Sequence, residues 1–119
     1  MNMQAAPKMT ACTLLCVPPD KVHELWPHVA AMLGSIFLLG IGDETIDDLR
    51  EQVSDGRSLL WIVWDDTRQS IVACGTTKLV QTTKLKICYV TAWAGRFMAT
   101  WLGLLDRIEK YAKDEGCDI

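Results

Sequence analysis

The chain has 119 residues, of which 50% are hydrophobic and five are tryptophan. This length suits one domain with one core, and this apolar content excludes a disordered chain. The formal net charge of −3 argues against a general nucleic-acid binder, which normally carries a basic patch. We therefore expect a single domain over residues 1–119 that binds no nucleic acid.

The sequence shows no signal for a membrane or for export. No apolar run approaches the roughly 20 residues of a membrane span. The nearest run, from Ile36 to Ile41, is interrupted by glycine. Residues 1–10 lack the apolar region and cleavage site of a secretory signal. A cytoplasmic location without membrane contact is the expectation.

The cysteines do not resemble a disulfide framework, because their number is odd and they are scattered through apolar segments. We expect reduced thiols. Cys12 and Cys16 share one face of an expected strand, and His23 and His28 follow nearby. The five-residue spacing of the histidines places them on different faces of a helix, so no metal site is expected.

The first part of the chain predicts a strand and two helices. Residues 11–17 form a short apolar run ended by two prolines. Apolar residues then recur at steps of three and four up to Leu33, which predicts a helix that Pro27 kinks or restarts. A second helix is predicted after Thr45, which can cap it together with Asp48, and Gly56 supplies a stop.

Three strands follow, over residues 59–64, 70–80 and 85–91, separated by polar turns. They predict an antiparallel meander. The first of them is apolar at every position, so both of its faces need cover and helices should pack on both sides of the sheet.

Residues 92–95 predict a loop, and the apolar periodicity that starts at Phe97 predicts a long helix. On its wet side we expect the ion pairs Asp106–Lys110 and Glu109–Lys113. Gly116 ends this helix. The segment from Cys117 onward is expected to start a strand parallel to residues 85–91, because a crossover helix joins parallel strands.

This order, β-α-α-β-β-β-α-β in an α/β domain with a mixed, mostly antiparallel sheet, is similar to that of the GNAT superfamily of acyl-coenzyme A N-acyltransferases. Three phrases resemble the small phage-type members: residues 25–27, residues 56–61, and residues 108–112 running into Gly116 and Cys117. The resemblance implies acetyl-coenzyme A as cosubstrate and an amine on a small molecule or protein as acceptor.

In that family the loop after the fourth strand holds the coenzyme A pyrophosphate. The expected physical reason is that the first N–H groups of the helix after this loop have no internal partner and point outward with the positive end of the helix dipole. Here Gly95 matches the loop pattern, whereas Ala92 and Phe97 depart from it, and Arg96 offers a compensating charge. Trp93 and Trp101 are candidates to line a cleft for the pantetheine arm, with a core role as the alternative. The resemblance implies these cofactor-binding residues: Val90, Thr91, Ala92, Trp93, Gly95, Arg96 and Phe97.

No catalytic residue is assigned. Tyr89 and Glu44 are conceivable participants in proton transfer, although a half-buried aromatic and an exposed first-turn acid explain them as well. The family's tyrosine acid lies on a helix beyond Ile119. The resemblance therefore implies an incomplete C-terminal part, and a bare strand edge that predicts a homodimer or a longer natural chain.

Three hypotheses remain open at this point. The first is transfer of an acetyl group from acetyl-coenzyme A to an amine. The second is a catalytically inactive phage protein of the same fold that blocks or bridges a host protein, which the alanine at position 92 favours. The third is an α/β domain of unrelated ancestry.

Overall fold

The structure is a computed structural model that describes residues 12–38 and 45–118. Its elements, in chain order, are the strand β1 (Cys12–Val17), the 3-10 turn η1 (Pro19–Lys21), the helices α2 (Val22–Leu38) and α3 (Ile46–Ser54), the strands β2 (Leu59–Asp65), β3 (Ser70–Gln81) and β4 (Lys86–Gly95), the 3-10 turns η2 (Met98–Thr100) and η3 (Leu102–Leu105), and the helix α4 (Asp106–Asp114).

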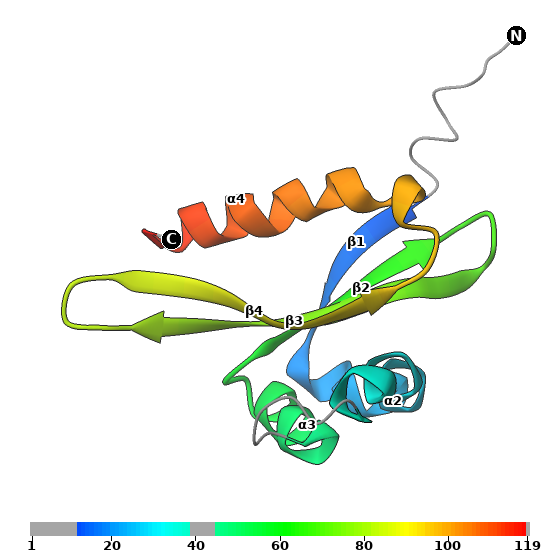
Figure 1. Cartoon of the computed structure of the whole chain (residues 1–119), viewed down its shortest axis with the longest axis horizontal. Coiled ribbons are helices and arrows are strands. Elements are labelled where there is room, and N and C mark those ends of the chain that lie inside the picture. Colours follow the sequence, from blue (N-terminus) through cyan, green and yellow to red (C-terminus); the bar gives the residue numbers. More distant parts are fainter. Residues whose placement is uncertain (1–11, 39–44, 119) are drawn as a thin grey trace, which may run out of the picture.

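The four strands form one antiparallel sheet in the order β1-β2-β3-β4, so β1 and β4 are its edges (Figure 1). The predicted meander is confirmed. The predicted parallel partner of β4 is not among the described strands. Instead, Asp118 lies beside the start of β4, where its N–H donates to the Lys86 carbonyl at 2.8 Å and its carboxylate accepts the Lys86 N–H at 2.9 Å.

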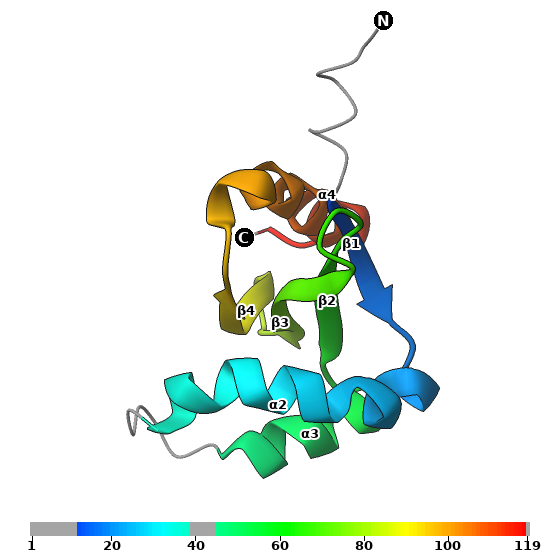
Figure 2. The same cartoon turned by 90° about the vertical axis from the view of Figure 1, so that its right-hand side faces the viewer.

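Helices cover both faces of the sheet, as predicted. α2 and α3 lie on one face and α4 on the other (Figure 2). The first core joins α2 and α3 to the sheet through buried side chains such as Leu33 and Leu60. The second joins α4 and η3 to the opposite face through residues such as Trp61, Val63 and Ile108. Burial on both faces explains why β2 is apolar from Leu59 to Trp64.

The helix α3 was predicted correctly from the residues at its two ends. Thr45 accepts a hydrogen bond from the Asp48 N–H at 3.1 Å, and the Asp48 carboxylate accepts the Thr45 N–H at 2.9 Å. This reciprocal pair satisfies two amides that the first helical turn leaves without partners. Gly56 has φ of +84°, a conformation that favours glycine, and lies just beyond the end of the helix.

Two details of the helices differ from the sequence prediction. The restart considered at Pro27 does not occur, because α2 runs through this proline as one helix. Pro27 has no N–H to donate to the His23 carbonyl, so the helix lacks one backbone hydrogen bond at this point. In α4 the predicted Glu109–Lys113 pair is present at 3.2 Å, whereas Lys110 pairs with Asp114 at 2.7 Å rather than with Asp106.

The end of β4 also differs from the prediction. Residues 92–95 are strand rather than loop, and they pair with residues 73–76 of β3. Gly95 is small because a Cβ there would lie 2.5 Å from that of Ala73 and 2.9 Å from the Trp101 ring. The bend comes later, at Phe97, whose φ of 58° is left-handed. Two 3-10 turns follow, so α4 begins only at Asp106.

Candidate functional site

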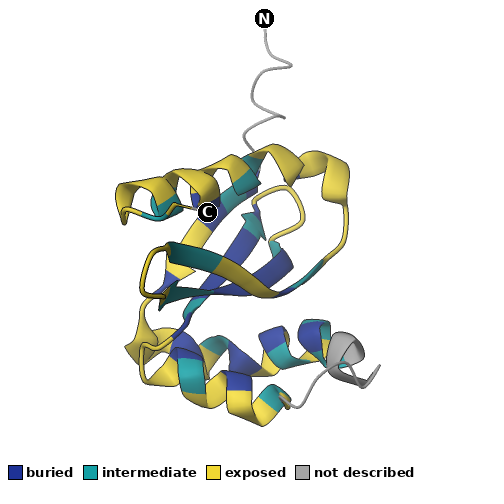
Figure 3. Cartoon of the chain, turned by 60° about the vertical axis from the view of Figure 1, so that its left-hand side comes forward, coloured by how far each residue is buried: buried dark blue, intermediate teal, exposed yellow. Residues whose placement is uncertain are grey.

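β4 is an exposed edge strand. Tyr89 is 48% exposed and Val90 57% exposed. Figure 3 shows the contrast with the buried strands in the middle of the sheet. Within the described residues, only β3 pairs with β4, apart from the contact of Asp118 with Lys86. The outer edge of β4 therefore presents backbone donors and acceptors to a ligand or another strand.

A β-bulge interrupts β4 at its middle. Val90 pairs with Thr77 and Ala92 with Thr76, so Thr91 is the extra residue. The Thr91 and Thr76 hydroxyl oxygens are 2.6 Å apart, and the Thr91 hydroxyl also lies 3.3 Å from the Thr76 carbonyl oxygen. Bulges bend a strand and re-aim its side chains, often beside active sites. Val90 and Thr91 were both predicted to contact the pantetheine arm. Thr91 forms this bulge and Val90 lies directly before it.

Beyond the bulge, side chains alternate between the two faces. Ala92 and Ala94 pack on the core under α2, and Trp93 packs on the core under α4. Gly95 faces Trp101 on the α4 side. Arg96 points to the α2 side, where its side chain lines a cavity.

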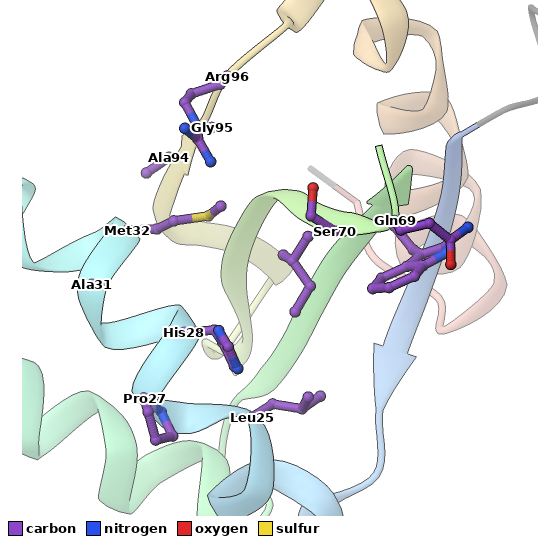
Figure 4. Close-up of a pocket in the computed structure, with 12 residues that line it drawn as sticks. Leu25, Pro27, His28, Ala31, Met32, Gln69, Ser70, Ala94, Gly95 and Arg96 are labelled. Atoms are coloured by element: carbon purple, nitrogen blue, oxygen red, sulfur yellow. The ribbon is translucent and has the colours of Figure 1, made fainter. Parts of the chain in front are cut away.

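This cavity has a volume of about 920 Å³ and lies between α2, the β2–β3 turn and the end of β4 (Figure 4). Most of its lining is apolar, and the described part of the chain contributes no acidic side chain to it. Arg96 and His28 bring nitrogen atoms to it from opposite walls. The lining residues are Leu25, Pro27, His28, Ala31, Met32, Trp64, Gln69, Ser70, Ile71, Ala94, Gly95 and Arg96.

Hydrogen bonds hold the backbone of Arg96 in place, whereas its side chain has no ion-pair partner among the described residues. Its N–H donates to the Val72 carbonyl at 2.7 Å, and its carbonyl accepts the Trp101 indole N–H at 2.6 Å. Its guanidinium forms no ion pair with any described residue and lies 5.9 Å from the centre of the Phe97 ring. A cation anchored in this way can hold an anionic group at the cavity.

Phe97 contacts a residue that the sequence did not single out. The Arg68 guanidinium lies 3.7 Å from the centre of the Phe97 ring. Arg68 also forms an ion pair with the buried Asp65, at 2.7 Å. The hydrogen bond from Arg68 lowers the pKa of Asp65 in spite of the desolvation that burial causes. The three-residue spacing of Asp65 and Arg68 is a signal that could have indicated their pairing, whereas nothing local links them to Phe97.

The physical basis predicted for the phosphate site is wrong in one respect. Gly95 does not open a helix, and the N-terminus of α4 at Asp106 lies two 3-10 turns further along the chain. A helix dipole therefore does not act at Gly95. The cofactor-binding role of residues 90–93 and 95–97 stays a prediction, which now depends on the edge of β4 and on the charge of Arg96.

Trp93 and Trp101 belong to the core under α4, the alternative considered for them. Their ring centroids are 5.8 Å apart, and Trp101 is 3% exposed. The Trp93 indole N–H is buried without an acceptor among the described residues. Of the two candidates for proton transfer, Tyr89 is exposed on β4, and Glu44 lies outside the described residues.

The thiols are free, and desolvation raises the pKa of some of them. Desolvation raises the pKa of Cys74 to about 12 and also raises that of Cys16. Within residues 12–38 and 45–118, no group of three or more potential ligands is arranged to hold a metal ion. Neither α2 nor another helix of these ranges has the length and hydropathy of a bilayer-crossing segment. The free cysteines are Cys12, Cys16, Cys74, Cys88 and Cys117.

No family model and no curated protein sequence matches the chain, but solved structures do. A GNAT family acetyltransferase from Staphylococcus aureus aligns over 91% of this chain and 82% of its own, with a TM-score of 0.63 at 10% identity. An aminoglycoside acetyltransferase from an uncultured soil metagenomic sample, in complex with sisomicin, aligns over 92% and 74%, with a TM-score of 0.68 at 8% identity.

The glucosamine-6-phosphate N-acetyltransferase of Arabidopsis thaliana aligns over 90% of this chain and 78% of its own, with a TM-score of 0.61 at 13% identity. The chain has the fold of the GNAT acetyltransferases. This confirms the fold class predicted from the order of elements. At such low identities the likeness to GNAT structures establishes the fold alone, so activity and ligands need support from the site.

Proposed function

We propose that the protein is an acyl-coenzyme A-dependent N-acyltransferase that moves an acetyl group from acetyl-coenzyme A to an amine. The observation that carries the proposal is a bulged edge strand, β4, that ends at an uncommitted guanidinium on the rim of a cavity. The GNAT fold supports it, because the acetyltransferases of similar structure share this frame.

The cofactor is proposed to lie along the outer edge of β4. Val90, Thr91, Ala92 and Trp93 would offer backbone groups to the amides of the pantetheine arm, as an edge strand does to an added strand. Gly95, Arg96 and Phe97 would lie beside the diphosphate. Arg96 supplies the charge there, since a guanidinium binds phosphate oxygens through charge-assisted hydrogen bonds.

We infer that the acceptor amine is not a polycation. Two of the similar structures act on amines of different charge, an aminoglycoside and glucosamine 6-phosphate. Among the described residues no acidic side chain lines the cavity beside β4, so this cavity offers no counter-ion to a polycation.

Calorimetry with acetyl-coenzyme A tests the cofactor proposal. We expect saturable heat and a higher melting temperature at millimolar ligand, because a ligand that binds the folded state stabilises it. Arg96→Ala should weaken binding about tenfold, the order expected for a charge-assisted hydrogen bond. Arg107→Ala, at an exposed position of α4, is the matched control and should bind like the parent protein. Absence of both heat and thermal shift in the parent protein would remove the cofactor proposal.

The second candidate is a binding module without catalytic activity. The observation that favours it is Ala92, which stands where the family pattern has Gln or Arg and is buried within β4 with 6% exposure. A buried methyl group cannot donate a hydrogen bond to a ligand. A folded protein that gives no response to acetyl-coenzyme A would favour this candidate.

Several wider expectations also remain proposals. We propose that residues 1–119 act as one cytoplasmic domain of a phage-type protein. We further propose that it forms a homodimer through an exposed strand edge that the cofactor leaves free. Light scattering across a dilution series checks this, and a stable monomer at every concentration would count against the dimer.

A further inference from the structure

One side-chain contact joins the two walls of the cavity from outside. Arg68 lies in the β2–β3 turn, directly before the lining residues Gln69 and Ser70. Phe97 directly follows the lining residue Arg96. The guanidinium of Arg68 lies 3.7 Å from the centre of the Phe97 ring. A cation over an aromatic face at this distance attracts it electrostatically, so the contact ties the turn to the end of β4.

Asp65 holds the guanidinium of Arg68 in place. Its carboxylate is 1% exposed and accepts a hydrogen bond from Arg68 Nη1 at 2.7 Å. The other carboxylate oxygen accepts the backbone N–H groups of Thr67 and Arg68, at 2.8 and 3.2 Å. Because all these bonds lie within one turn, the carboxylate fixes both the turn and the direction of the arginine side chain.

The ring on the other side of the contact belongs to a residue with unusual backbone geometry. Phe97 has φ of 58° and ψ of 43°, a region that costs energy for a residue other than glycine. Its carbonyl accepts the N–H and the hydroxyl of Thr100, at 2.9 and 2.7 Å. The Arg96 guanidinium lies 5.9 Å from the same ring. Phe97 thus connects the conformation of the bend to both arginines.

We infer that Arg68, held by Asp65, is a positioning residue for the cofactor site. By stacking on Phe97 it keeps the bend after β4 in its left-handed conformation and directs the Arg96 guanidinium to the rim of the cavity. The inference rests on the proposed function, in which Arg96 meets the coenzyme diphosphate. Arg68 acts through Phe97 and is not assigned a contact with the ligand.

The test is a double-mutant cycle on binding of acetyl-coenzyme A, measured by calorimetry. Arg68→Ala should weaken binding about threefold to fivefold, the range that one cation–π contact at an exposed site supports. Arg68→Lys should retain part of the affinity, since it keeps the charge but not the planar stack. In a Phe97→Leu background, Arg68→Ala should have no further effect, because the stack is already absent.

A matched control separates this role from general stability. Arg57 also forms a short ion pair across an exposed turn, with Asp55 at 2.7 Å, but it does not line the cavity. Arg57→Ala should leave the affinity unchanged. Equal loss from Arg68→Ala in both backgrounds, or no loss in either, would overturn the inference.

Amide hydrogen exchange in the free protein gives a second readout that needs no cofactor. The Arg96 and Trp101 amides are hydrogen-bonded to the Val72 and Met98 carbonyls. Arg68→Ala should speed their exchange several-fold, and Arg57→Ala should not. If the parent protein fails to bind acetyl-coenzyme A, the proposed function falls, and exchange alone then decides whether Arg68 positions the bend. Unchanged exchange would refute that.

Discussion

β2 and β4 belong to one sheet but use their residues differently. Every residue of β2 from Leu60 to Val63 is buried, whereas Ala92 alone is buried in β4. A central strand has two neighbours and a helix on each face, so packing occupies all its groups. An edge strand keeps one row of backbone groups and several side chains free. In this protein the central strand stabilises the fold, and the edge strand is the part available for a ligand.

The largest expected effect tests how firmly the second half of β4 is packed. A Cβ on Gly75 of β3 would lie 1.9 Å from the Trp93 ring and 2.6 Å from the Ala92 carbonyl oxygen. Gly75→Ala should therefore destabilise the protein by about 3 kcal/mol, because neither the ring nor the backbone can move freely.

Urea unfolding measures the difference. Gly103→Ala is the control, since a Cβ there meets nothing within 4 Å, and it should change the stability little. Equal losses in the two variants would show that Trp93 does not pack against β3.

A pair of matched truncations compares the two strands directly. Val63 in β2 is 0% exposed and Val90 in β4 is 57% exposed. Val63→Ala should cost about 2 kcal/mol of unfolding free energy, because it leaves a cavity in the core. Val90→Ala should change it by less than about 0.5 kcal/mol. Chemical denaturation of both variants checks the difference, and a large loss at Val90 would mean that the edge of β4 is covered.

The sequence predicted the central strand β2 correctly but not the end of the edge strand β4. The cap at Thr45 and the strand predicted at residues 59–64 were predictable because their signals are local, a Thr–Asp spacing and an unbroken apolar run. Residues 92–95 were mistaken for a loop, since two alanines and a glycine have no strand preference. Their pairing with residues 73–76 of β3 makes them a strand, and close contact with Ala73 explains the glycine at position 95.

The candidate site was predictable only in part. The segment from Val90 to Phe97 was singled out by the resemblance to the GNAT superfamily, but the bulge at Thr91 had no local signal. The cavity and the Arg68–Phe97 contact depend on segments far apart in the chain. Their geometry arises only when β3 pairs with its two neighbouring strands. The spacing of residues within one segment therefore could not predict it.

The smallest expected effect concerns the turn that ends β2. The hydrogen bond from Arg68 lowers the pKa of Asp65 below its usual value, near 3.9. A lowered pKa means that the carboxylate stabilises the folded state above the usual pKa, and that this contribution is lost as the pH falls through the lowered value.

Thermal unfolding between about pH 6 and pH 3 measures this contribution. Asp65→Asn should lower the melting temperature at neutral pH and flatten its fall in acid. Asp20→Asn, at an exposed position, should leave the pH profile unchanged. A parent profile that Asp65→Asn does not alter would contradict the role of the ion pair.

The most direct test of the account maps the binding of acetyl-coenzyme A onto the backbone by nuclear magnetic resonance. We predict that amide shifts concentrate in residues 90–99, along the bulged edge of β4 and the bend after it. β1, the opposite edge of the same sheet, serves as the internal control and should stay unchanged. Shifts on β1 instead of β4, or no shifts at millimolar ligand, would contradict the assignment of the cofactor to β4.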